Sequence, residues 1–211
     1  MRVDDQASTS VKLILASTSP YRKELLERLK IPFVVMRPGV DESALPSEMP
    51  AETARRLARA KSQAISLHFP GHVVIGSDQV ADWQGMALGK PGSKQAAREQ
   101  LTKLSGQRVM FHTAVCVSLG DQSWTAETAT TCCFRTLTDQ AIKRYIEIDN
   151  PVDTAGSAKA ESLGIALMES MQSDDPTAII GLPMIALTRL LRQAGLDPLI
   201  DHTTTVNQPS T

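Results

Sequence analysis

The chain has 211 residues and a formal net charge of −1, and hydrophobic residues make up 42% of it. This balance is that of an ordinary globular domain and excludes a broad surface for polyanions, so any phosphate chemistry must come from a local group of basic side chains. Aromatic residues are only 4%, which argues against repeated stacking platforms for single strands, and no apolar run approaches the roughly 20 residues of a bilayer span.

Both ends of the chain are predicted to be disordered tails. Residues 1–10 lack the apolar segment of a secretory signal, and residues 201–211 are rich in Thr, Pro and Ser. Residues 11–200 are therefore expected to form a single domain. The expected location is cytoplasmic, and the expected partners include neither a membrane nor a nucleic-acid polymer.

A buried strand over Val11–Ala16 is predicted to lead into a helix over residues 20–29. Ser19 suits the N-cap, and a strand that turns directly into a helix leaves backbone N–H groups free to bind an anion. Arg22 lies in the first turn, where a cation is disfavoured unless an anion is near. Ser17, Ser19 and Arg22 are thus candidate phosphate-binding residues, with a plain helix cap and a solvated arginine as the alternative.

The next candidates lie in a turn and on a helix. A strand over Phe33–Met36 is followed by a turn containing Pro and Gly that ends in Glu42. Residues Glu52–Leu67 then form an amphipathic pattern that predicts a helix carrying Lys61. A rigid scaffold commonly presents reactive groups in loops next to its helices and strands, so Glu42 and Lys61 are candidates for such groups.

A third strand is predicted over Val73–Ile75, followed by the polar run Gly76-Ser77-Asp78-Gln79. Asp78 is therefore expected at the carboxyl end of a strand, where open α/β sheets bind ligands. The remaining elements are expected in this order: a hairpin turn at Gln84–Gly85, a helix from Ser93 to about Leu104, long antiparallel strands over Val109–Leu119 and Ser123–Arg135, a helix over Asp139–Ile148, a glycine-bearing loop over Ala155–Gly164 and a helix over Pro183–Ala194. The predicted fold class is α/β, with a mixed, long central sheet and flanking helices.

Four residues in these loops and elements have the chemistry of a phosphate site. The carboxylates of Glu42 and Asp78 can hold a divalent cation such as magnesium or manganese, or Asp78 can orient or deprotonate water. Lys61 and Lys90 can neutralise phosphate charge. The alternative is a set of surface ion pairs that contribute little. The four histidines lack metal-ligand spacing, and no G-x-S-x-G pattern supports a serine hydrolase.

Several of these segments together resemble the Maf family of nucleotide pyrophosphatases. The resemblance lies in the segments Leu15–Leu26 (LASTSPYRKELL), Ala58–Lys61 (ARAK), Ile75–Val80 (IGSDQV), Leu88–Pro91 (LGKP), Ser105–Gly106, Ala155–Ser157 (AGS) and Gly181–Pro183 (GLP). It covers nearly the whole of residues 11–200.

The resemblance implies a Maf/ITPase-like fold with two lobes around a cleft, a homodimer, and hydrolysis between the α and β phosphates of a nucleotide. It implies that Asp78 is the proton acceptor. It also implies that Ser17, Arg22, Glu42, Lys61 and Lys90 handle the phosphates and a divalent metal cation.

Three positions indicate the branch of this family. Tyr21, Gln79 and Glu161 stand where dTTP/UTP pyrophosphatases carry Arg, Thr and Gln, so the chain resembles the 7-methyl-GTP pyrophosphatase branch. N7-methylated guanine is a cation and should stack on an aromatic face such as Tyr21, while Glu161 can accept from its two donor groups. Gln79 offers both a donor and an acceptor to the rest of the base edge.

Two alternatives stay open at this point. One is the same reaction on dTTP, UTP or another non-standard nucleotide. The other is a nucleotide-binding regulator of septum formation without catalytic activity. The complete set of Asp, Lys and Arg positions counts against a pure binder, which has no need for a carboxylate that activates water.

Overall fold

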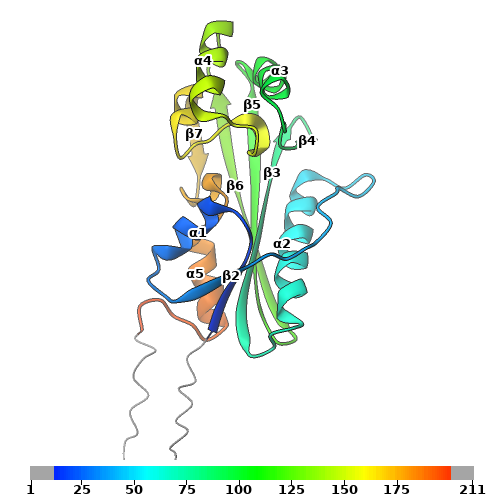
Figure 1. Cartoon of the computed structure of the whole chain (residues 1–211), viewed down its shortest axis with the longest axis vertical. Coiled ribbons are helices and arrows are strands. Elements are labelled where there is room, and N and C mark those ends of the chain that lie inside the picture. The colour runs from blue at the N-terminus through cyan, green and yellow to red at the C-terminus, as the bar shows by residue number, and fades with distance from the viewer. Residues whose placement is uncertain (1–11, 201–211) are drawn as a thin grey trace, which may run out of the picture.

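The structure, a computed structural model, describes residues 12–200, so both predicted tails lie outside the described residues (Figure 1). Its strands are β1 Lys12–Ala16, β2 Phe33–Met36, β3 His72–Trp83, β4 Met86–Leu88, β5 Arg108–Leu119, β6 Gln122–Phe134 and β7 Met168–Ser173. Its α-helices are α1 Pro20–Glu27, α2 Pro50–Ser66, α3 Lys94–Leu104, α4 Asp139–Asp149 and α5 Met184–Gln193, with short 3₁₀ turns at η1 Ala155–Ser157, η2 Leu163–Leu167 and η3 Ala178–Ile180. The predicted α/β class is confirmed.

All seven strands form one mixed sheet, in the order β2-β1-β3-β5-β6-β7, with β4 paired to β3. The strands β1, β2 and β3 run parallel, whereas β3, β5 and β6 are long and antiparallel. Figure 1 shows α2 on one face of these long strands and α1 with α5 on the other. Among residues 12–200, no helix combines the length and apolarity that a bilayer span requires.

The third strand is much longer than predicted, and this corrects the expected place of Asp78. The run Gly76–Gln79 lies inside β3 and does not follow its end. Beyond Gly76, which pairs with Ala16 at the end of β1, the strand continues by antiparallel pairing with β5. Asp78 therefore lies in mid-strand, but just past the point where β1 stops. The strand whose carboxyl end lies beside Asp78 is therefore β1 and not β3.

One strand and one helix start differ from the sequence prediction. The segment Met168–Ser173 was not predicted as a strand, yet it pairs with the end of β6 as β7. Its polar sequence suits an edge strand, which needs no apolar run on both faces. The helix α2 begins at Pro50 and not at Glu52, because the Glu52 side chain accepts a hydrogen bond from the Met49 backbone N–H and so caps the first turn.

Two large hydrophobic clusters occupy opposite ends of the long strands. The first packs α1 and α5 against β1 and the neighbouring half of β3 and β5, as in Leu25, Ile75 and Leu187. The second packs α3 and α4 around the other half of the sheet, as in Leu101, Phe111 and Tyr145. This division gives the molecule the two lobes that the family resemblance implies.

Candidate active site

A cleft of about 910 Å³ opens where β1 turns into α1, between the two clusters. It is lined by residues from both lobes, including parts of α1, α2, β3, the segment after β4, the loop around η1 and the end of η3. Every site residue predicted from the sequence lines it: Ser17, Ser19, Tyr21, Arg22, Glu42, Lys61, Asp78, Gln79, Lys90 and Glu161. The fold thus brings together side chains that span about 140 residues of sequence.

The centre of the cleft holds a cation between two carboxylates. The Nζ atom of Lys61 lies 2.7 Å from Asp78 Oδ1 and 2.7 Å from Glu42 Oε1. Lys61 and Asp78 are buried, with 4% and 6% of their surface exposed, whereas half of the Glu42 side chain is exposed. Buried charges of this kind persist only when they are paired, so each of the three groups depends on the other two.

The charge of Glu42 is set by its surroundings. Partial burial on its own would raise the pKa of this carboxyl, but the hydrogen bond from Lys61 and the positive charges of Lys61, Lys90 and Arg22 lower it below the ordinary value. Glu42 is therefore a carboxylate near neutral pH. It can accept hydrogen bonds or bind a cation at the mouth of the cleft.

Arg22 reaches the same space from α1. Its Nε atom donates to the Gly181 carbonyl oxygen at 2.8 Å, and its Nη1 atom lies 3.5 Å from Ser17 Oγ. Burial lowers the pKa of the guanidinium, while the charges of Asp78 and Glu42 oppose that change. An arginine stays cationic in such a site, so its free N–H groups remain available for an anion.

The start of α1 offers fewer free amides than the sequence predicted. The Arg22 backbone N–H donates to Ser19 Oγ at 3.4 Å, and the Ser19 N–H donates to Ser17 Oγ at 3.1 Å. Pro20 has no N–H to give. These serines serve first as caps, which is the alternative that the sequence left open. A phosphate bound here would depend mostly on the side-chain cations of the cleft.

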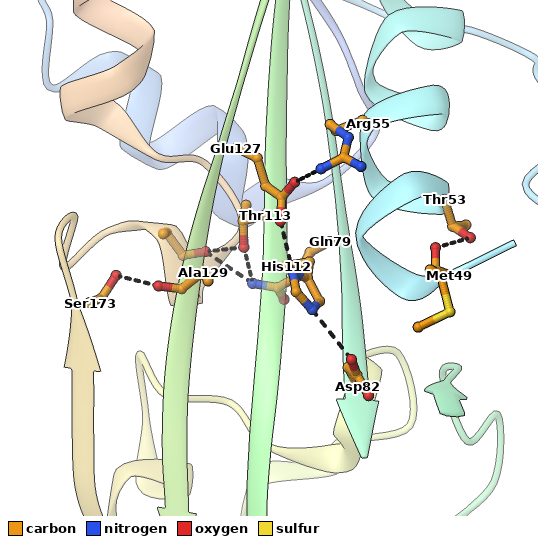
Figure 2. A network of polar contacts seen from close by, with 11 residues as sticks. Met49, Thr53, Arg55, Gln79, Asp82, His112, Thr113, Glu127, Ala129 and Ser173 are labelled. Carbon is orange, nitrogen blue, oxygen red and sulfur yellow. Dashed lines mark hydrogen bonds and ion pairs between the residues drawn. The ribbon is translucent and has the colours of Figure 1, made fainter. Parts of the chain in front are cut away.

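Gln79 does not have the double role expected of it. Its Nε2 atom donates to the carbonyl oxygens of Ala178 and Ile179, at 3.0 and 2.9 Å. It also lies 3.0 Å from Thr113 Oγ1, the contact that Figure 2 shows. Two carbonyl partners fix which end of the amide is the nitrogen. The donor is used within the protein, so Gln79 can offer only its carbonyl oxygen to a ligand.

Another part of the cleft is lined by one aromatic ring and two carboxylates. Tyr21 and Glu161 line it together with Asp153, which the sequence analysis did not single out. Glu161 is exposed, yet partial loss of water around it, with the charges of Asp149 and Asp153, raises its pKa against the opposing charge of Lys159. This end is acidic, whereas the Arg22 end is basic.

Two positioning residues were also missed. Ser77 is fully buried and its Oγ lies 2.8 Å from the Ala114 carbonyl oxygen and 2.9 Å from that of Gly181. Gly181 has φ +116°, a conformation that L side chains rarely adopt, and its carbonyl meets Arg22. Both lie in motifs that carry the family resemblance, but only the contacts between those motifs reveal their role.

The donor set for a divalent cation is a pair of carboxylates. Within residues 12–200 no group of three or more His, Cys, Asp or Glu side chains is arranged to hold a metal ion. Glu42 and Asp78 nevertheless share one cation, Lys61, at hydrogen-bonding distance. Magnesium is commonly bound by one or two carboxylates together with waters and substrate phosphates, so this pair fits a site that the substrate completes.

Comparisons with known proteins agree with this geometry. The Maf-like protein family matches residues 12–194. The chain is 60% identical over 191 residues to the 7-methyl-GTP pyrophosphatase of Bordetella pertussis (strain Tohama I), a match that covers 90% of this chain and 96% of that protein. It is 51% identical over 196 residues to the protein of the same name from Polaromonas sp. (strain JS666), covering 92% and 90%.

The solved structure of the Staphylococcus aureus Ham1 protein overlaps this chain in part, with a TM-score of 0.43 and 17% identity over 58% of this chain and 71% of that one. The match to the Maf-like family is much more extensive, since it spans almost all of the described residues and includes each cleft residue named above. The chain therefore belongs to the Maf-like protein family.

Proposed function

We propose that this protein hydrolyses 7-methyl-GTP to 7-methyl-GMP and pyrophosphate and so removes a modified nucleotide. The observation that carries the proposal is the convergence of Arg22, Lys61 and Lys90 with the carboxylates of Glu42 and Asp78 in one cleft. The name shared by the Bordetella and Polaromonas relatives supports the choice of substrate.

The phosphates are placed at the basic end of the cleft. Arg22 is held by Gly181 and Ser17, and Lys90 is exposed on the segment after β4 with no ion-pair partner among the described residues. Charges oriented in advance stabilise a phosphoryl transition state without reorganising at the moment of reaction. A divalent cation held by Glu42 and Asp78 would add positive charge against the phosphate oxygens.

Asp78 is the group we assign to the attacking water. Its Oδ1 already accepts a hydrogen bond from Lys61, which leaves Oδ2 to accept a proton from water. The water oxygen bonds to the α phosphorus, the bond from that phosphorus to the bridging oxygen breaks, and pyrophosphate leaves. Lys61 holds Asp78 and Glu42 in place during this exchange.

The base lies at the acidic end, near Tyr21 and Glu161. A methylated guanine carries a positive charge, and its two donor groups on one edge match a carboxylate. The Gln79 carbonyl oxygen can accept one further hydrogen bond. A pyrimidine lacks this paired donor set, so Glu161 would be left without a partner.

The test is pyrophosphate release from 7-methyl-GTP, GTP, dTTP and UTP, each with magnesium, with manganese and with a chelator. We expect 7-methyl-GTP to have the highest kcat/KM and the chelator to remove most activity. Asp78→Asn should lower kcat by about 10²–10⁴-fold, the usual contribution of a positioned base. The matched control is Asp82→Asn, because Asp82 belongs to the same strand but does not line the cleft.

Each other outcome has a definite meaning. Faster cleavage of dTTP or UTP would move the substrate to the pyrimidine alternative, and nucleotide binding without hydrolysis would favour the regulator. Near-normal turnover by Asp78→Asn would remove Asp78 from its role. We further propose a cytoplasmic homodimer, on the strength of the family resemblance, and light scattering of the purified protein tests the dimer.

A further inference from the structure

Lys159 lies behind the base end of the cleft and contacts two of the residues that line it. Its Nζ is over the ring of Tyr21, 5.8 Å from the centroid, and 3.0 Å from Asp153 Oδ1. Only 13% of the Lys159 side chain is exposed, against 55% of Asp153. The Lys159 ammonium is thus largely buried and does not line the cleft, whereas Tyr21 and Asp153 do.

The pKa shifts of Lys159 and Asp153 are both in the direction expected for an ion pair. Burial would lower the pKa of Lys159, but the hydroxyl of Tyr21 and the carboxylate of Asp153 raise it above its usual value. Burial would likewise raise the pKa of Asp153, and Lys159 lowers it. An ammonium that contacts both a tyrosine and a carboxylate fixes both partners more firmly than either contact alone.

The loop that carries Lys159 is anchored to α4 by three hydrogen bonds. The Lys159 backbone N–H donates to the Tyr145 hydroxyl at 2.9 Å. The Asp149 carboxylate accepts from Ser162 Oγ at 2.6 Å and from the Gly164 N–H at 3.1 Å. A Cβ atom at Gly164 would lie 2.4 Å from the Lys159 carbonyl oxygen, so only glycine allows this close approach. The backbone at Lys159 is therefore held in place, and its side chain can keep Tyr21 in one orientation.

We propose that Lys159 is a positioning residue for base recognition, which orients Tyr21 and Asp153 at the acidic end of the cleft. This inference rests on the proposed function, because it assumes that the base binds there. Lys159 contacts Tyr21 near its hydroxyl and lies 5.8 Å from the ring centroid, so the ring face stays free for a base to stack on.

The ammonium does not make this end of the cleft repel a cationic base. Asp153 pairs with Lys159, and Glu161 interacts electrostatically with Lys159, Asp149 and Asp153, so three carboxylates share one ammonium charge. The local balance stays negative. Lys159 reduces the repulsion among the acids while leaving a field that attracts a methylated purine.

The experiment compares Lys159→Met with the wild type on 7-methyl-GTP, GTP and UTP. Methionine keeps most of the stem and removes the charge. We expect KM for both guanine nucleotides to rise about tenfold, the size of one partly desolvated cation–π contact with its ion pair, while kcat falls less than threefold. KM for UTP should change less, because the smaller, uncharged uracil ring gains less from stacking on an oriented Tyr21. Lys159→Arg should restore much of the loss, since arginine also lies over aromatic rings.

Two further variants separate positioning from simple structural support. In Asp153→Asn the KM for 7-methyl-GTP should rise, and the double variant Lys159→Met/Asp153→Asn should be no worse than Lys159→Met, because the two residues act as one unit. The matched control is Lys143→Met, an exposed lysine on α4, which should match the wild type.

Three results overturn the proposal. One is an equal fall in kcat/KM for all three nucleotides together with a lower Tm, which indicates a structural role. Another is a lower KM for 7-methyl-GTP in Lys159→Met, which means that Lys159 only repels the cationic base. The third is an unchanged KM. If the wild type itself shows no preference for 7-methyl-GTP, the proposed function is wrong. This result is obtained without any variant, so it is distinguishable from a failure of the proposal about Lys159.

Discussion

The carbonyl oxygen of Gly181 decides where the guanidinium of Arg22 lies. It accepts from Arg22 Nε and from Ser77 Oγ, so a residue at the end of η3 and a residue inside β3 together fix a side chain on α1. Neither partner has chemistry of its own to offer a nucleotide. Their effect is to keep one cation oriented before the substrate arrives, which is how electrostatic stabilisation is obtained at low cost.

Glu48 plays a comparable part for the loop that carries Glu42. Its carboxylate accepts from Arg56 Nε at 2.6 Å and Arg56 Nη2 at 2.7 Å, and also from Thr53 Oγ1 and the Leu45 N–H. The hydrogen bonds from Arg56 are the main reason that the pKa of Glu48 falls from 4.5 to about 2. The loop is thereby tied to the first turns of α2.

This lowered pKa predicts a pH dependence of stability with a definite sign. Because the folded pKa of Glu48 lies below the unfolded value, the contribution is complete above about pH 4.5 and is lost as pH falls through about 2. We expect Glu48→Gln to have a lower Tm than the wild type at pH 6, and the gap to shrink between pH 4.5 and pH 2.

Thermal unfolding followed by circular dichroism across this pH range provides the measurement. The control is Glu147→Gln, an exposed glutamate on α4 with no ion pair among the described residues, whose Tm should follow the wild type. A gap in Tm that stays constant down to pH 2 would contradict the assignment to Glu48.

At the level of elements, the position of α2 sets the position of Lys61. The helix approaches the sheet closely because small residues face it, with Ala54 and Ala58 packed against Ala114. Ion pairs hold its two flanks: Lys61 binds Asp78 on one side, and Arg55 Nη1 lies 2.5 Å from Glu127 Oε2 on the other (Figure 2). Glu127 also meets His112 Nδ1 at 2.7 Å.

Gly76 is the residue that permits this close approach. A Cβ atom there would lie 2.2 Å from the Ala58 carbonyl oxygen and 2.5 Å from the Ser62 backbone nitrogen. Gly76→Ala must therefore push α2 away from the sheet, and we expect a loss of about 1–3 kcal/mol in the free energy of unfolding. Activity should fall as well, because Lys61 moves with the helix.

Urea unfolding and pyrophosphate release measure the two effects of Gly76→Ala. The matched control is Gly71→Ala, since a Cβ atom at Gly71 meets nothing within 4 Å and its φ is not positive. Equal stability of the two alanine variants would show that α2 has room to move without cost.

The cleft lies between two hydrophobic clusters and is lined by residues of both lobes, so a nucleotide that fills it would contact both. A ligand that binds only the folded protein raises its stability, by about 2.7 kcal/mol at 100 times its Kd. This effect can be measured in Asp78→Asn, which should bind the nucleotide but turn it over very slowly.

We expect Asp78→Asn to show a higher Tm with 7-methyl-GTP and magnesium than with 7-methylguanosine, which lacks the phosphates. A chelator should reduce the shift, because in this variant Glu42 and the phosphate oxygens still bind magnesium together. Differential scanning fluorimetry gives the comparison directly. The same shift with the nucleoside as with the nucleotide would mean that Arg22, Lys61 and Lys90 do not hold the phosphates.

The sequence by itself determined the local elements other than β7 and the far half of β3, and it identified the main charged residues of the cleft. The apolar run of β1, the cap at Ser19 and the amphipathic pattern of α2 each depend on neighbouring residues, so they can be read along the chain. Residue chemistry and the family resemblance together selected ten residues that the structure places in one cleft.

Only the tertiary structure decided how those residues are used. Gly76–Gln79 are poor strand formers, yet they continue β3 because β5 supplies every partner. The Gln79 amide is turned inward by carbonyls about a hundred residues away, and the Lys61 ammonium meets carboxylates from two separate segments. Hydrogen bonds and ion pairs form between groups that folding brings within about 3 Å, whatever their separation in sequence, so no local pattern encodes them.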